Sequence, residues 1–171
     1  FLASATASGF ALAAGPLMAQ TAINTPSDGL DTAEVKIPVA GGEMPGYIAT
    51  PKGATRRATV MVIPEVFGMH EYQRDICRRL AKAGYAGVSF DPFFRMGDLS
   101  KMSNIQDVVR LASSLEDKQM LADMDSVIAW IEKQPKANAK MIGVTGMCMG
   151  GRSTWMFAAH SANCLLYTSD A

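Results

Sequence analysis

Three continuous apolar segments are the feature that most constrains the fold of this chain. They are residues 58–65 (ATVMVIPE), 84–91 (GYAGVSFD) and 140–146 (KMIGVTG). Short apolar runs of this kind are typical of strands buried on both faces, which occur mainly in parallel sheets covered by helices. The sequence therefore predicts an α/β protein.

Helical patterns separate these segments. Residues 71–83 carry apolar side chains at helical spacing, and residues 118–134 carry a second apolar stripe, with Ser113 and Glu116 in capping-box spacing before it. A third helix is expected from Gly150 onward. Alternation of strands and helices implies right-handed crossovers and a mostly parallel sheet with helices on both faces.

Before the first apolar segment, two short extended runs at 35–39 and 46–50 predict an opening hairpin. Residues 21–31 (TAINTPSDGLD) are polar and turn-forming, which indicates a linker. The folded part then covers residues 32–162 and belongs to one domain, since the roughly 150 residues after the first 20 are an ordinary length for one domain.

The first 20 residues are uncharged and rich in Ala, Ser and Gly, and small residues surround a possible cleavage point at Ala19 to Ala22. This pattern predicts the apolar part of an export signal, and the opening FLASA resembles the residues after the paired arginines of a twin-arginine signal. The alternative is a membrane anchor, which needs about 20 predominantly apolar residues. We expect export to the periplasm, with no stable membrane association after cleavage.

Charge and cysteine content exclude several classes of protein. Sixteen Lys and Arg balance sixteen Asp and Glu, so there is no basic excess for binding nucleic acid. Cys77, Cys148 and Cys164 are an odd number without C-x-x-C spacing, which indicates neither a disulfide framework nor a zinc site. We interpret Cys77 as a half-buried helical thiol.

The motif that carries chemistry is residues 146–151 (GMCMGG), at a predicted junction of strand and helix. Its spacing is typical of a nucleophile elbow with Cys148 in the serine position. Gly146 and Gly150 let strand and helix approach, and the N–H of Met149 points toward a developing oxyanion. The alternative is a buried structural cysteine in a glycine-rich turn.

Residues 62–95 (VIPEVFGMHEYQRDICRRLAKAGYAGVSFDPFFR) and 140–151 (KMIGVTGMCMGG) closely resemble the dienelactone hydrolase family of the α/β-hydrolase superfamily. The resemblance implies the α/β-hydrolase fold and hydrolysis of cyclic enol-lactones and related esters through a cysteine. It also implies an aspartate and a histidine, later in the chain, that complete a triad, and it implies neither a metal nor an organic cofactor. The substrate is then a small molecule.

The resemblance assigns roles to five residues. Cys148 is the nucleophile, and Glu65 takes the proton of its thiol. A partly apolar cleft raises the affinity of such a carboxylate for protons. Val66 and Met149 supply the oxyanion-hole N–H groups, and Arg95 holds a substrate carboxylate with its planar fork. The alternatives are a Glu65 carboxylate satisfied by backbone N–H groups and an Arg95 in a surface ion pair.

Neither histidine is a candidate triad base. His160 lies twelve residues after Cys148, about 18 Å along a helix, too far for a hydrogen bond to the thiol. His70 follows the E-V-F-G turn in a loop. We interpret it as solvated or helix-capping, with an approach to the cleft mouth as the alternative.

The chain stops 23 residues after Cys148, and its tail 163–171 (NCLLYTSDA) has no family counterpart that we recognise. The tail resembles a translated sequencing adapter. We therefore expect a fragment truncated at both ends, incomplete at the C-terminus of the fold and inactive by itself. The expected function of its parent is carboxylic ester hydrolysis. Alternatives are a non-catalytic protein that binds small carboxylates or a partner on the same scaffold, and a redox-sensing thiol.

Overall fold

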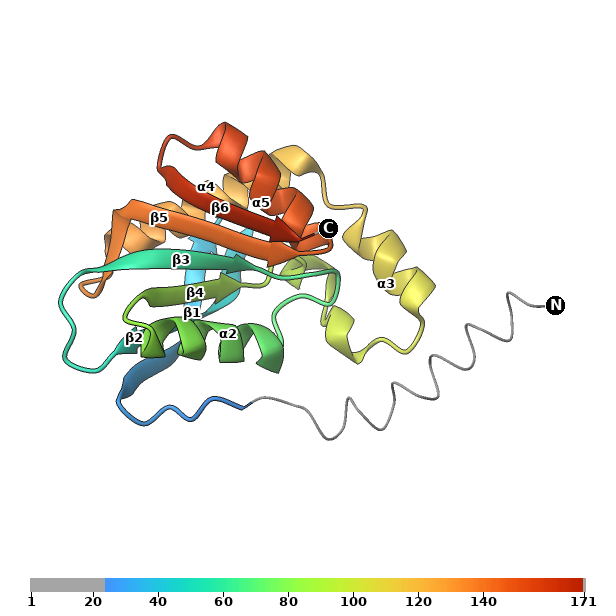
Figure 1. Ribbon diagram of the computed structural model, residues 1–171. Coiled ribbons are helices and arrows are strands. Elements are labelled where there is room, and N and C mark those ends of the chain that lie inside the picture. The colour runs from blue at the N-terminus through green and yellow to red at the C-terminus, as the bar shows by residue number, and fades with distance from the viewer. Residues whose placement is uncertain (1–23, 171) are drawn as a thin grey trace.

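The three apolar segments form the centre of a six-stranded sheet in the computed structural model, which describes residues 24–170 (Figure 1). Strand β3 (Arg57–Ile63) lies between β4 (Ala86–Phe90) and β5 (Ala137–Met147), and both pairings are parallel. All five residues of β4 are buried. The predicted parallel arrangement is confirmed.

Two antiparallel strands precede this centre, and a further strand follows it. β1 (Leu30–Val39) and β2 (Gly42–Pro51) form a hairpin, and β2 pairs antiparallel with β4. β6 (Cys164–Asp170) lies parallel to β5, so the strand order is β1-β2-β4-β3-β5-β6. The hairpin is longer than the predicted runs 35–39 and 46–50, because edge strands carry exposed polar residues that hide the alternation.

Helices cover both faces of the sheet. α2 (Glu71–Lys82) packs on one face, and α4 (Asp117–Glu132) and α5 (Met149–His160) pack together on the other (Figure 1). Neighbouring residues of β3 therefore belong to different cores: Val62 lies in the cluster under α2, and Ile63 lies in the larger cluster under α4. This layering agrees with the helices predicted at 71–83, at 118–134 and from Gly150.

The thiol of Cys77 is completely buried, contrary to the expectation of a half-buried helical thiol. The reason is that the backbone of α2 lies directly on β4. A Cβ atom added at Gly87 of β4 would lie 2.6 Å from the carbonyl oxygen of Cys77. Burial raises the pKa of the Cys77 thiol.

The expected capping box of Ser113 and Glu116 is wrong. Ser113 instead follows the last residue of a helix that the sequence did not reveal, α3 (Ile105–Ala112), and Glu116 precedes α4 without a side-chain capping bond. Two 3₁₀ turns, η1 (Phe94–Met96) and η2 (Leu99–Lys101), complete the connection between β4 and α3. These pieces are too short for a clear helical period.

The described part of the expected linker 21–31 is bound to the domain. The backbone N–H of Thr25 donates to Asp75 of α2, and Arg78 Nε donates to the Thr25 carbonyl at 2.7 Å. Because Asp75 and Arg78 are both buried, this short segment contributes to packing. The expected export signal, residues 1–20, lies outside the described residues. Within 24–170, no helix is long and apolar enough to cross a bilayer.

Candidate functional site

Three side chains that can take part in proton transfer or nucleophilic attack follow the ends of the three central strands. Glu65 comes after β3, Asp91 after β4 and Cys148 after β5. The strands are parallel neighbours, and Ile63 at the end of β3 is aligned with Gly146 near the end of β5. The three residues therefore lie side by side at the carboxyl ends of the strands, where ligands bind in open α/β folds.

Cys148 occupies the sharp turn between β5 and α5. Its φ of 54° is the only positive value at a non-glycine position among residues 24–170, and its ψ is −126°. A side chain in this region of φ/ψ space is strained and persists only where the surrounding packing imposes it. The residue is exposed, so its thiol is accessible at the N-terminus of α5.

Two glycines allow this turn to form. A Cβ atom at Gly146 would lie 2.5 Å from the backbone of Gly150, and one at Gly150 would collide with the carbonyl oxygens of Ile63 and Pro64. The first turn of α5 thus packs directly on the end of β3. This contact places Cys148 beside the strand that leads to Glu65.

Val66 and Met149, the expected oxyanion-hole residues, share one apolar cluster. Val66 is buried in this cluster, which includes Phe93 and Leu99 and against which Met149 packs. Met149 is also the first residue of α5, where backbone N–H groups have no acceptor within the helix. The arrangement brings together the segments that carry the two expected donors.

Both oxygens of the Glu65 carboxylate accept a hydrogen bond from a side chain. His70 Nε2 lies 2.7 Å from Oε1, and Gln73 Nε2 lies 2.5 Å from Oε2. Burial alone would raise the pKa of Glu65, but the hydrogen bond and charge of His70, a backbone hydrogen bond and the bond from Gln73 together outweigh it and hold this pKa below its usual value. The expected raised proton affinity is therefore wrong, because the sequence did not reveal these two partners.

His70 is more than a solvated loop residue. It is the N-cap of α2, where its Nδ1 accepts from the backbone N–H of Tyr72, and its side chain also contacts Glu65. The capping alternative and the approach to the cleft are thus both confirmed. The signal in the sequence was the spacing of His70 and Gln73, which is that of a capping box.

Arg95 forms a two-pronged ion pair with Asp123 of α4. Nη1 lies 2.7 Å from Oδ2 and Nη2 lies 3.0 Å from Oδ1, and Nη2 also donates to the carbonyl of Ala40. The guanidinium stacks over the ring of Phe94 at 4.4 Å. Because Asp123 is buried, this pair has a structural role, which favours the ion-pair interpretation. Binding of a substrate carboxylate by Arg95 stays a prediction.

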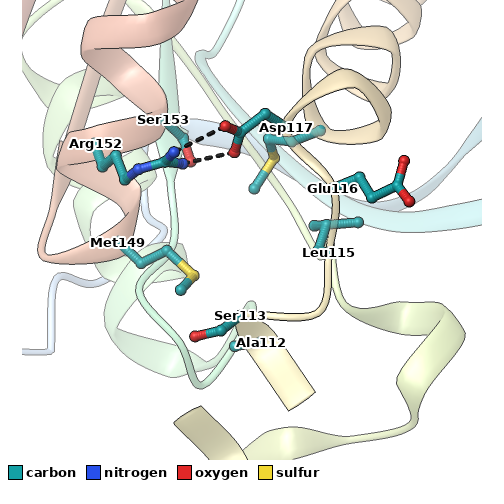
Figure 2. Close-up of a pocket in the computed structure, with 9 residues that line it drawn as sticks. Ala112, Ser113, Leu115, Glu116, Asp117, Met149, Arg152 and Ser153 are labelled. Carbon is teal, nitrogen blue, oxygen red and sulfur yellow. Dashed lines mark hydrogen bonds and ion pairs between the residues drawn. The ribbon is translucent and has the colours of Figure 1, made fainter. Parts of the chain in front are cut away.

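A cavity of about 520 Å³ borders Met149 (Figure 2). Its walls come from the connection between α3 and α4, including Ser113, and from the first turns of α5. Arg152 of α5 closes one side through a two-pronged ion pair with Asp117 of α4, at 2.7 and 2.8 Å. The cavity has both polar and apolar walls beside an expected oxyanion donor.

A second cavity, of about 440 Å³, borders His70 and the strand-end carboxylate Asp91. Burial, reinforced by the charge of Asp98, raises the pKa of Asp91 to about 6. The sequence analysis did not identify Asp91 as a site residue. Its position directly after a buried strand was the available signal.

His160 lies away from the carboxyl ends of the central strands. His160 is at the far end of α5 from Cys148, as its spacing in the sequence predicted. Its Nε2 lies 2.8 Å from Oδ2 of Asp125. In the part of the chain that the structure describes, no group of three His, Cys, Asp or Glu side chains is arranged to hold a metal ion.

The sheet, its helices and the turn at Cys148 define an α/β-hydrolase fold. A crystal structure described as a putative dienelactone hydrolase from Klebsiella pneumoniae has a TM-score of 0.75 and 39% sequence identity, over 82% of this chain and 58% of that one. A model of the dienelactone hydrolase family matches residues 44–166. The chain belongs to the dienelactone hydrolase family.

Two relatives carry the name "Putative carboxymethylenebutenolidase". The one from Methylorubrum extorquens is 43% identical over 94% of this chain and 55% of its own length. The one from Escherichia coli K12 is 40% identical over 94% of this chain and 59% of its own length. The chain thus spans little more than half of these relatives. The family match ends at residue 166, inside the segment 163–171 for which no counterpart was recognised.

Proposed function

We propose that this chain carries the nucleophile half of an exported hydrolase that cleaves a lactone or related ester through Cys148. The observation that carries the proposal is the strained turn at Cys148, exposed at the N-terminus of α5 and packed on the strand that leads to Glu65. Strain at an exposed nucleophilic side chain is typical of a nucleophile elbow. Export through residues 1–20 stays a prediction.

In the acylation step, the Glu65 carboxylate takes the proton of the Cys148 thiol. The sulfur lone pair forms a bond to the carbonyl carbon, and the π electrons move onto the carbonyl oxygen. The N–H groups of Val66 and Met149 donate to this oxyanion. The bond between the carbonyl carbon and the ester oxygen then breaks, and that oxygen takes the proton that Glu65 received from the thiol, which restores the Glu65 carboxylate.

In the deacylation step, water adds to the acyl carbon of the thioester and the Cys148 thiolate departs. Negative charge at Cys148 is favoured by the N-terminus of α5, which has a partial positive charge. The family resemblance implies that an aspartate and a histidine later in the chain act here. Neither His70 nor His160 is proposed for that step.

The relatives' name specifies the substrate class that we propose. A butenolide is an unsaturated cyclic ester, and its ring opening gives a product in which the leaving oxygen remains attached to the acyl group. A carboxymethylene substituent adds a carboxylate to such a substrate. Since the Arg95 fork is already paired with Asp123, we do not assign that carboxylate a partner within the described residues.

The test is hydrolysis of an enol-lactone and of a simple aryl ester by the full-length protein and its Cys148→Ala variant. We expect Cys148→Ala to lower kcat by at least about a thousandfold, because loss of a covalent nucleophile removes the reaction path. His160→Gln is the matched control, since His160 lies at the opposite end of the same helix. It should keep full activity.

A Cys148→Ala variant that retains more than about a tenth of the wild-type kcat would contradict the proposal. Binding of small carboxylates with no turnover in the wild-type protein would support the non-catalytic alternative. Mass spectrometry of the wild-type protein quenched during turnover should find an acyl group on Cys148 only.

A further inference from the structure

The N-terminus of α2 presents two side-chain donors to the Glu65 carboxylate, one to each oxygen. His70 is the N-cap and Gln73 is the third residue of the helix, so the helix cap and the Glu65 contacts come from the same two residues. Gln73 is 2% exposed, and the Glu65 side chain is 19% exposed. The Glu65 side chain is thus fixed by a rigid element.

The cap determines which nitrogen of His70 carries the proton. The backbone N–H of Tyr72 can only donate, so His70 Nδ1 must accept and be unprotonated. Nε2 then carries the hydrogen of the neutral ring and donates it to Glu65 Oε1 at 2.7 Å. The helix cap therefore fixes the tautomer that Glu65 requires in its ionised form.

The cap also determines the orientation of the Gln73 amide. The backbone N–H of His70 donates to Gln73 Oε1, which turns the NH₂ group of Gln73 toward Glu65 Oε2. Each residue thus uses one polar atom for the cap and another for Glu65. A protonated Glu65 would have to direct its own hydrogen toward one of these two donors or away from both.

We propose that His70 and Gln73 are positioning residues that hold Glu65 as a carboxylate in a single rotamer, so that it can accept the proton of the Cys148 thiol. The proton-acceptor role of Glu65 rests on the function proposed above, but the stabilisation of its charged form by His70 and Gln73 does not. Two oriented N–H donors stabilise the charged form of a carboxyl group and disfavour the neutral form.

The two donors oppose the effect of burial on Glu65. Burial raises the pKa of this carboxyl group, and the hydrogen bond and charge of His70, a backbone hydrogen bond and the bond from Gln73 together lower it to a greater extent. The other charged groups near His70 are Glu71 and Arg74 of α2, and Asp91 and Asp98 from the segment after β4. Among the described residues, none of these four forms a side-chain hydrogen bond with Glu65.

Two substitutions separate the cap from the hold on Glu65. His70→Asn keeps a good N-cap, because asparagine is among the preferred capping residues, but its side chain is too short to replace Nε2. Gln73→Glu keeps the acceptor of the capping box but replaces the donor to Glu65 with a second carboxylate. A purely structural role predicts no effect of either variant on Glu65, since the cap remains.

The experiment follows the side-chain ¹³C carboxyl signal of Glu65 against pH in the full-length protein, assigned by its loss in Glu65→Gln. We expect the midpoint to move upward by about 1–2 pH units in each variant, because a hydrogen bond to a charged group contributes about 1.5–3 kcal/mol. Ser126→Ala, a half-buried site on α4, is the control. A midpoint that stays at the wild-type value in both variants would overturn the proposal.

Two further measurements decide the remaining outcomes. Long-range ¹⁵N correlation spectra of the wild-type protein should show His70 protonated at Nε2 and not at Nδ1; the opposite tautomer would overturn the proposal even if the variants failed to fold. The rate of Cys148 alkylation by iodoacetamide should fall toward acid pH, and the midpoint of this fall should also move upward in both variants. If the Glu65 midpoint moves but the alkylation midpoint of Cys148 does not, the result supports stabilisation of the Glu65 charge by His70 and Gln73 and contradicts the proton-acceptor role of Glu65.

Discussion

Asp91 follows β4 in a partly enclosed position beside the cavity that borders His70. Its Oδ1 accepts the backbone N–H of Phe93 at 3.0 Å, which turns the chain toward η1. A Cβ atom at Gly68 would lie 2.7 Å from the same oxygen, so the carboxyl group packs closely against the loop that carries Glu65. Burial of this kind makes the charged form of a carboxyl group costly.

We predict that Asp91→Asn stabilises the full-length protein above about pH 6. The pKa of Asp91 is about 6 in the folded protein and 3.8 without the fold. The folded state therefore binds this proton more tightly, and the resulting stability is complete below pH 3.8 and lost as the pH rises through about 6. Asparagine keeps the acceptor for Phe93 and never ionises.

Urea unfolding checks this prediction at two pH values. At pH 8 the variant should gain about 1–2 kcal/mol in the free energy of unfolding, which allows for partial solvent screening, and at pH 4 the gain should almost disappear. An equal gain at both pH values would show that the charge of Asp91 is not responsible.

At the scale of elements, the position of α2 depends on its contact with β4. The helix backbone at Cys77 lies so close to Gly87 that a Cβ atom there would be 2.7 Å from the Cys77 Cα atom and 2.6 Å from its carbonyl oxygen. The same helix supplies His70 and Gln73 at its N-terminus. A displacement of α2 would therefore change both the core and the contacts of Glu65.

We expect Gly87→Ala to lower the free energy of unfolding by about 1–3 kcal/mol, the usual cost of overpacking in a core. The measurement is urea unfolding at constant pH. Gly143→Ala in β5 is the matched control, because the nearest atom to its added Cβ would be 3.7 Å away. An equal loss in both variants would mean that glycine flexibility, and not the α2–β4 contact, sets the effect.

For the whole molecule, the two edges of the sheet differ in character. The β1 edge carries charged side chains such as Lys36 and Glu34, which protect an edge strand against pairing with another chain. The β6 edge instead exposes large apolar side chains: Leu165 at 65%, Leu166 at 68% and Tyr167 at 48%. An apolar, unpaired edge of this kind favours association.

We predict that residues 24–171 expressed alone self-associate through β6. Leu166→Lys should shift the population toward the monomer, because a charge at an edge strand opposes intermolecular pairing. Light scattering after size-exclusion chromatography measures the effect. Val109→Lys, on the exposed side of α3, is the control, and it should leave the association unchanged. The prediction would be refuted if residues 24–171 without a substitution were monomeric.

The sequence alone determined the central architecture and the position of Cys148, the proposed nucleophile, between a strand and a helix. The apolar runs at β3, β4 and β5 indicate strands that are buried on both faces, and the glycines around Cys148 indicate a close approach of strand and helix. These features are local, so they can be recognised without the fold. The family resemblance rested on the same residues, and the family match confirms it.

Only the tertiary structure determined which side chains meet. Arg95 pairs with Asp123, 28 positions away, and Glu65 is held by residues five and eight positions further on, across a turn into α2. Periodicity shows which face of an element is buried but not which partner it meets there. The charge of Glu65 and Asp91 depends on those partners and on burial, and therefore could not be derived from residue type and spacing.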